Sequence, residues 1–78
     1  MSQSHIHARR QAERRDRAAR YGVILRSALK DAGLTPHSFY GYSGIHSSQT
    51  SDYMNGRCYP NRKNRQRIYA VLRVRELA

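Results

Sequence analysis

Apolar residues recur at helical spacing in the first half of the chain. Residues 8–32 contain no proline and are rich in alanine and arginine, which favour helices. Five apolar residues within them follow the i, i+3/i+4, i+7 spacing of an amphipathic helix: Ile24, Leu25, Ala28, Leu29 and Ala32. We expect a helix that ends at Gly33, frays toward its start across Gly22, and leaves residues 1–7 disordered.

Two short helices are predicted in the middle of the chain. Thr35 followed by Pro36 is typical of a helix start, and the helix should cover residues 36–42. Ser43 and Gly44 then form a turn. The second helix should begin after a cap at His46 or Ser47, run to residue 54, and end at the Asn-Gly pair of residues 55–56.

A last helix is expected from a cap at Asn61 to about residue 77, with Ile68, Val71, Leu72 and Arg75 on one face. No strand-like alternation interrupts this pattern. The chain therefore reads as all-α, a small four- to five-helix bundle, with a basic N-terminal arm or helix extension over residues 1–20 and the main domain over residues 21–78.

The two short helices have the spacing of a helix-turn-helix unit. Gly44 supplies a turn without a Cβ clash, and Phe39, Ile45 and Tyr53 stand at offsets that face inward between the helices. These three should close on an aliphatic set formed by Leu25, Leu29, Leu34, Ile68 and Leu72. The start of the second helix is then left exposed, as entry into a DNA major groove requires.

The distribution of charge along the chain indicates the kind of partner that the protein binds. Fifteen lysines and arginines face five acids, giving a net charge of +10. Six arginines lie in residues 1–20 and seven cations in residues 57–75, whereas residues 31–56 hold none. This layout suits a protein whose middle contacts bases while its flanks bind a phosphate backbone. We expect no membrane partner, because no segment pairs the arginines with a broad apolar face.

The run from residue 25 to 72 resembles the lambda-repressor/Cro (XRE-type) helix-turn-helix family. The resemblance rests on Gly33-Leu34-Thr35, Ser43-Gly44-Ile45, Ser47-Ser48-Gln49, Asn55-Gly56-Arg57 and Pro60 before Ile68 and Leu72. The chain departs from the family at Tyr40, where a small residue is usual, and at Thr50, where a branched aliphatic residue is usual. Residues 62–67 are also more polar than in the family's last helix.

The single cysteine, and the lack of an apolar run of membrane-span length or a signal-peptide pattern, lead us to expect a cytoplasmic protein. The resemblance implies a sequence-specific DNA-binding regulator of transcription, a repressor of the phage or plasmid type, acting as a homodimer on double-stranded DNA. It implies base reading by Ser47, Ser48, Gln49, Ser51 and Asp52. Glutamine suits adenine, and a carboxylate suits cytosine N4 if an arginine neutralises it. Backbone contacts are expected from Thr35, His37, Arg57, Tyr59, Arg62 and Lys63. Tyr69 is the first candidate for a subunit contact, with Tyr40 and Tyr42 as others.

The N-terminal arginines leave an alternative open. Arg9, Arg10, Arg14, Arg15 and Arg17 can grip DNA phosphates, or they can form an RNA-binding helix like that of phage antitermination proteins, which they resemble in composition. A third class is a nonspecific architectural protein, which would bind every duplex with equal affinity at fixed salt. Enzymes and metal-binding proteins find no support in the sequence. His5 and His7 lack further metal ligands, and no nucleophile elbow or paired carboxylates indicate an enzyme. We therefore expect no cofactor and no metal.

Overall fold

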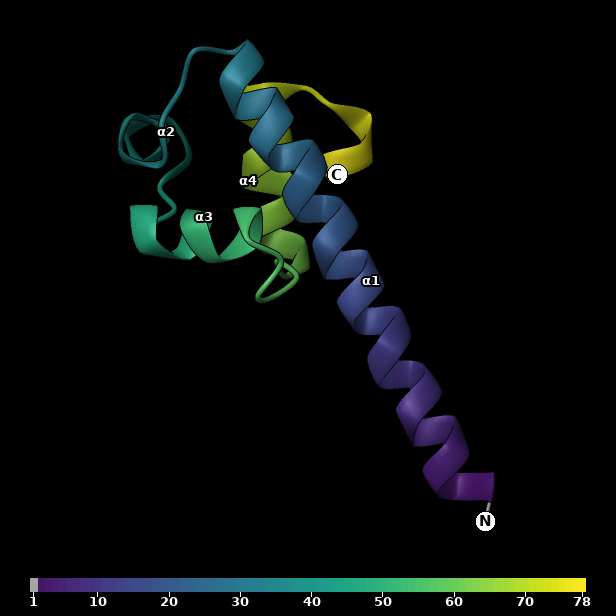
Figure 1. The fold of residues 1–78 in the computed structure, drawn as a ribbon. Helices are drawn as coiled ribbons and strands as arrows, with labels where there is room; N and C mark the ends of the chain where they lie inside the picture. The colour runs from purple at the N-terminus through teal and green to yellow at the C-terminus, as the bar shows by residue number, and fades with distance from the viewer. Residues whose placement is uncertain (1) are drawn as a thin grey trace.

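The first helix is the longest element and projects from the rest of the molecule. The computed structural model describes the backbone of residues 2–78 and the side chains of residues 12–78. Helix α1 (Ser2–Asp31) is continuous through Gly22, so the basic extension is helical and not a separate arm. Its N-terminal half extends away from the other helices (Figure 1). The expectation of disorder at the start is wrong for residues 2–7, where no glycine or proline interrupts the helix.

The end of α1 and the start of the next helix are capped by the residues that the sequence predicts. Gly33 takes a left-handed conformation (φ 70°), and the Leu34 amide donates to the Leu29 carbonyl at 2.9 Å, which closes α1. Helix α2 (Pro36–Ser43) follows at once, one residue longer than predicted. The Thr35 hydroxyl accepts from the Ser38 amide at 3.1 Å while the Ser38 hydroxyl accepts from the Thr35 amide at 2.8 Å, a complete capping box.

A three-residue turn joins α2 to α3 (Ser47–Met54). Gly44 is left-handed (φ 75°), and its amide donates to the Tyr40 carbonyl, so the turn needs the residue that the sequence provides. His46 caps α3 by accepting the Ser48 amide on Nδ1. Helix α3 is followed by its C-terminal cap, Asn55, and then by Gly56, which adopts a left-handed conformation (φ 70°). In Figure 1, α2 is seen end-on while α3 lies across the view, so the two helices cross.

The last helix is shorter than predicted. Helix α4 (Arg62–Leu72) begins at the expected Asn61 cap but stops at Arg73, which adopts a left-handed conformation (φ 58°). The chain then turns back through η1 (Arg75–Leu77), a short 3-10 helix that buries Leu77 completely. Arg75 is exposed, and does not lie on the apolar face of α4 as expected. The helix stops here because a continued helix would carry Leu77 away from the core.

The core contains the apolar residues that the spacing predicts. Phe39, Ile45 and Tyr53 are buried, as are Leu25, Leu29 and Ile68, whereas Leu34 and Leu72 pack against this cluster while partly exposed. Each fully buried Leu, Ile or Phe stabilises the fold by about 1.5–3 kcal/mol. Residues 2–78 thus form a small all-α domain of four helices without a β-strand.

Three core residues come from outside the predicted set: Ala18, Tyr21 and Leu77. The Tyr21 hydroxyl donates to the Leu77 carbonyl at 2.8 Å, which ties α1 to the end of the chain, and burial raises the pKa of this phenol. Ala18 is buried and Ala19 lies beside Gly56, so both belong to the folded body. The projecting part of α1 therefore ends before Ala18.

Two glycines let α1 pack directly on the end of α3. A Cβ on Gly22 would lie 2.6 Å from the Met54 carbonyl oxygen and 2.7 Å from that of Tyr53. A Cβ on Gly56 would lie 3.1 Å from the Ala19 Cα. All of these neighbours are backbone atoms and cannot rotate away. The glycine that the sequence analysis treats as a weak point of α1 is therefore the residue that permits this crossing.

We predict that Gly22→Ala destabilises the domain by about 2–3 kcal/mol, because the added methyl forces α1 and α3 apart. Gly41→Ala is the matched control: Gly41 is also helical, and a Cβ there has no neighbour within 4 Å. Removing a glycine from a helix without a clash should stabilise by about 0.5–1 kcal/mol. Urea unfolding followed by circular dichroism measures both. Equal effects of the two variants would contradict the close crossing.

Thr50 is a second departure from an ideal core. Its side chain is fully buried in α3, and its hydroxyl is the one buried side-chain oxygen or nitrogen without a hydrogen-bond partner among the described residues. A buried hydroxyl left unpaired costs about 1–3 kcal/mol. The surroundings of Thr50 therefore offer its hydroxyl no hydrogen bond.

We expect Thr50→Val to raise the free energy of unfolding by about 1 kcal/mol, since valine keeps the shape and removes the unpaired hydroxyl. Thr50→Ser keeps the hydroxyl, removes the methyl, and should cost about 1 kcal/mol. Thermal unfolding of the three proteins gives the comparison. A valine variant less stable than the original protein would show that the hydroxyl has a partner in solution.

Candidate nucleic-acid interface

The outer face of α3 carries the five residues predicted to read bases. Ser48 and Gln49 are exposed, and Ser47, Ser51 and Asp52 are partly exposed. Thr50 and Tyr53 anchor the opposite face of the same helix in the core. The Asn64 amide donates to the Tyr53 hydroxyl at 2.8 Å and fixes α3 against α4. The structure therefore brings the predicted reading residues together on one outward face with a fixed orientation.

The cap of α3 determines what Ser48 can offer to a ligand. Nδ1 of His46 accepts the Ser48 amide at 3.1 Å and lies 2.9 Å from the Ser48 hydroxyl oxygen. A nitrogen that accepts an amide carries no proton itself, so the Ser48 hydroxyl donates to it. The lone pairs of that oxygen remain free. Ser48 is thereby set to accept a hydrogen bond, as from a base amino group, and not to donate one.

Asp52 is neutralised from within the protein. Nη1 of Arg57 lies 3.0 Å from Oδ1 of Asp52, with 69% and 43% of the two side chains exposed. A pair this exposed adds at most about 1 kcal/mol to stability. Its consequence is electrostatic, because a carboxylate beside phosphate groups would otherwise be repelled. This is the arginine that the sequence analysis requires for Asp52 to face a base.

The residues predicted to bind the phosphate backbone divide into two groups. Thr35, His37, Arg62 and Lys63 are exposed at the starts of α2 and α4. Tyr59 differs, because its ring is partly buried. It meets Tyr21 edge-on at 5.3 Å between centroids, and the guanidinium groups of Arg17 and Arg65 lie over it at 4.3 Å and 5.0 Å. Tyr59 therefore joins α1 to α4 and holds two cations.

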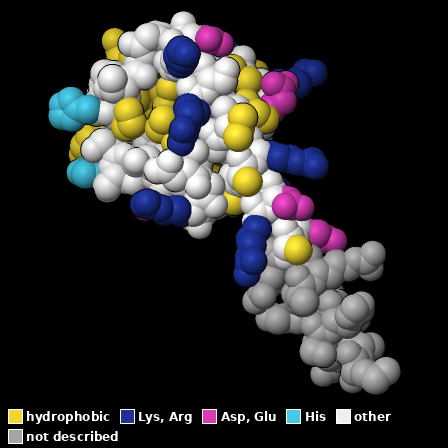
Figure 2. Space-filling view, viewed as in Figure 1, with side chains coloured by type: hydrophobic (Ala, Val, Ile, Leu, Met, Phe, Trp, Pro, Cys, Tyr) yellow, Lys and Arg dark blue, Asp and Glu magenta, His cyan; other side chains and the backbone are white. Residues whose placement is uncertain are grey.

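The arginines of α1 are largely uncompensated. Arg14, Arg15 and Arg17 are exposed, while the side chains of Arg9 and Arg10 lie outside the described residues. Figure 2 shows lysine and arginine side chains over the body and at the point where α1 leaves it. Over residues 12–78 the Arg57–Asp52 pair is the only salt bridge. Fifteen lysines and arginines against five acids favour binding of a polyanion.

Two neighbouring residues escaped the sequence analysis. Nη2 of Arg26 donates to Oδ1 of Asn55 at 2.8 Å, which links α1 to the end of α3. Arg26 stands one helical turn after Gly22 and shares its face, a spacing that could have identified it. Cys58 is exposed in the loop between α3 and α4. It follows Arg57 and precedes Tyr59, but nothing in the sequence indicates its place in a basic groove.

Among the residues that the structure describes, no three His, Cys, Asp or Glu side chains lie close enough together to hold a metal ion. None of the described helices is long and apolar enough to cross a membrane. His5 and His7 lie outside the described side chains.

Comparisons of the chain with protein-family models, with curated proteins and with solved structures find no match.

The Cys58 thiol gives a pH-dependent prediction. Partial burial, and then the Asp52 carboxylate, raise the pKa of Cys58 above its ordinary value. Because the thiolate is the reactive form, a raised pKa leaves less of it at neutral pH. We expect Cys58 to react with N-ethylmaleimide more slowly than N-acetylcysteine does at pH 7.5. Its reaction rate should also reach its plateau at a higher pH than the rate of N-acetylcysteine. Asp52→Asn should increase the rate at pH 7.5; no change would contradict the role of that carboxylate.

Proposed function

We propose that this protein is a sequence-specific DNA-binding regulator of transcription that inserts α3 into the major groove. The observation that carries the proposal is the division of α3 into a buried face, with Thr50 and Tyr53, and an outward face, with Ser48, Gln49 and Asp52. An α-helix with its side chains is about 10–12 Å in diameter. The major groove of B-DNA is about 12 Å wide and admits one α-helix.

The outward side chains have complementary chemistry for base edges. The Gln49 amide can donate to adenine N7 and accept from its N6 amino group. The Ser48 oxygen, whose proton is committed to His46, can accept from an amino group of adenine or cytosine. Asp52 keeps Oδ2 free beside its contact with Arg57 and can accept from cytosine N4. Three acceptor positions on one face can each meet the amino group that a base pair presents in the major groove, adenine N6 or cytosine N4.

Cations flank this face on the neighbouring elements. Arg62 and Lys63 are exposed in the first turn of α4, and the exposed residues Thr35 and His37 stand at the start of α2. Arg57 adds a cation directly after α3. A helix without any lysine or arginine, bordered by such groups, matches a division between base contacts and phosphate contacts.

The packing of α2 and α3 adds support for membership of the helix-turn-helix class. The residues on the inner sides of the turn, Phe39, Ser43 and Ile45, are all buried. Tyr40, where the family has a small residue, is 45% exposed with its ring 5.3 Å from that of His46, so it lies outside the helix crossing. We also propose a homodimer. Exposed Tyr42 and partly exposed Tyr69 are available aromatic contacts.

RNA binding by α1 is the second candidate function. The observation in its favour is the projecting helix itself, which is continuous and carries Arg14, Arg15 and Arg17 on its exposed surface. Replacing Arg9, Arg10, Arg14 and Arg15 by glutamine in the full chain separates the two functions. A DNA regulator keeps its sequence preference at lower affinity, whereas an RNA-binding protein of this kind loses its RNA and shows no preference among duplexes.

We predict that selection from random-sequence duplexes yields a symmetric site, and that Gln49→Ala relaxes the choice of base at one position of each half-site. The loss of discrimination there should be about 1–3 kcal/mol. Arg62→Gln is the comparison variant and should weaken binding to all duplexes equally, lowering the salt slope by about one. Equal affinity for every duplex at fixed salt would overturn the proposal.

A further inference from the structure

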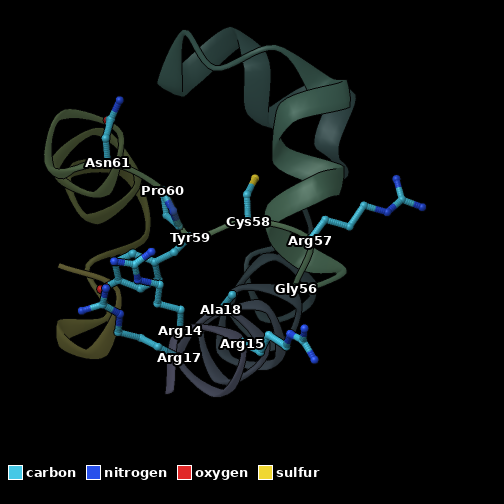
Figure 3. Close-up of a pocket in the computed structure, with 10 residues that line it drawn as sticks. All are labelled: Arg14, Arg15, Arg17, Ala18, Gly56, Arg57, Cys58, Tyr59, Pro60 and Asn61. Carbon is cyan, nitrogen blue, oxygen red and sulfur yellow. The ribbon is translucent and has the colours of Figure 1, made fainter. Parts of the chain in front are cut away.

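A basic groove lies where α1 meets the loop between α3 and α4. It has a volume of about 400 Å³. Its sides carry four arginines, Arg14, Arg15 and Arg17 from α1 and Arg57 from the loop, and none of its ten lining residues is acidic. In Figure 3, Arg14 and Arg17 lie beside Tyr59 on one side, Arg15 and Arg57 lie on the other, and Cys58 stands between them.

The bottom of the groove allows close approach. Gly56 has no side chain, Ala18 has a single methyl, and Pro60 is buried. A phosphate group carried on a sugar can therefore approach the bottom of the groove and reach cations on either side. Guanidinium groups bind phosphate oxygens through two parallel hydrogen bonds, which Arg14, Arg15 and Arg17 can offer, whereas Arg57 already contacts Asp52.

The groove is held rigidly by contacts outside it. The backbone crossing at Gly22 and Gly56 fixes α1 against the end of α3. The Arg17 guanidinium is held over the Tyr59 ring at 4.3 Å, and Arg65, which lies over the same ring, donates to the Pro60 carbonyl at 2.8 Å. Several like charges are thus kept close together before any ligand arrives. An anion in the groove relieves this repulsion.

We propose that this groove is a phosphate-binding site, and that its ligand is a backbone phosphate of the duplex contacted by α3. The identity of the ligand rests on the proposed function, whereas the preference for phosphate rests on the groove alone. Because the groove lies at the end of α3, a phosphate held there continues the contact surface from α3 onto α1. Residues 14–17, where α1 leaves the body of the domain, are thereby a fixed part of the interface.

Cys58 is the only cysteine in the chain and lines the groove, so it reports occupancy without engineering. The rate of its alkylation by uncharged N-ethylmaleimide is measured in the free protein, with a selected duplex, and with inorganic pyrophosphate. With duplex in about tenfold excess over its dissociation constant, we expect alkylation to slow by about tenfold. Pyrophosphate should also slow it at low salt.

The test variant is Arg14→Gln with Arg15→Gln, and the matched control is Arg20→Gln with Arg67→Gln. The control removes the same charge from exposed helical positions that do not line the groove. Rates are compared at equal fractional saturation, with binding followed by fluorescence anisotropy. The test variant should lose the protection of Cys58, and its salt slope should fall by about two, whereas the control keeps the protection.

The possible outcomes distinguish the phosphate site in the groove from the proposed recognition of DNA by α3. Sequence-preferring duplex binding that leaves Cys58 unprotected, or that protects it equally in the test variant, overturns the duplex phosphate as the ligand of the groove and leaves DNA recognition by α3 standing. Protection by pyrophosphate without any duplex binding supports the phosphate site and overturns the proposed function. Protection by pyrophosphate, but not by a bound duplex, assigns the groove to a free phosphate compound. Absence of both protection and binding overturns both proposals.

Discussion

The contact between the backbones of α1 and α3 determines the arrangement of everything else. Gly22 meets the carbonyl oxygens at the end of α3, and Gly56 meets α1 in return, so neither helix can shift without loss of contact. This crossing turns the polar face of α3 outward and sets the arginines of α1 beside the loop that follows α3. The Arg26–Asn55 hydrogen bond holds the same pair of helices, and the hydrogen bond from Tyr21 to the Leu77 carbonyl ties α1 to η1.

Charge is distributed around this frame in a way that separates two kinds of contact. Helix α3 carries no lysine or arginine, so its outward side chains contribute no positive charge. Cations stand on α1, on α4 and in the loop, where they attract a polyanion without competing for base edges. The Asp52–Arg57 pair joins the two regions, because it would keep the single carboxylate of α3 compatible with the phosphates of the proposed duplex.

Much of the fold could be predicted because local signals determine it. Thr35, Gly44, Asn61 and Gly33 act through their own backbone neighbours, and the aliphatic spacing identifies the core. Features that depend on distant partners could not be predicted. From the sequence, Gly22 is expected to weaken α1, and only its backbone neighbours on α3 show why a glycine is needed there. Leu77 reaches the core only because Arg73 turns the chain back. The outward face of α3 was predictable, whereas the groove required α1 and the loop together.

The most direct test of the central claim is a map of backbone amide shifts, by nuclear magnetic resonance, as a selected duplex is added to the protein. If one surface recognises DNA, the amides of Ser48 and Gln49 and those of Arg14 to Arg17 shift together, with a common dissociation constant, while those of η1 stay in place. Shifts confined to α1, with α3 unaffected, would contradict the claim that the polar face of α3 is presented to nucleic acid.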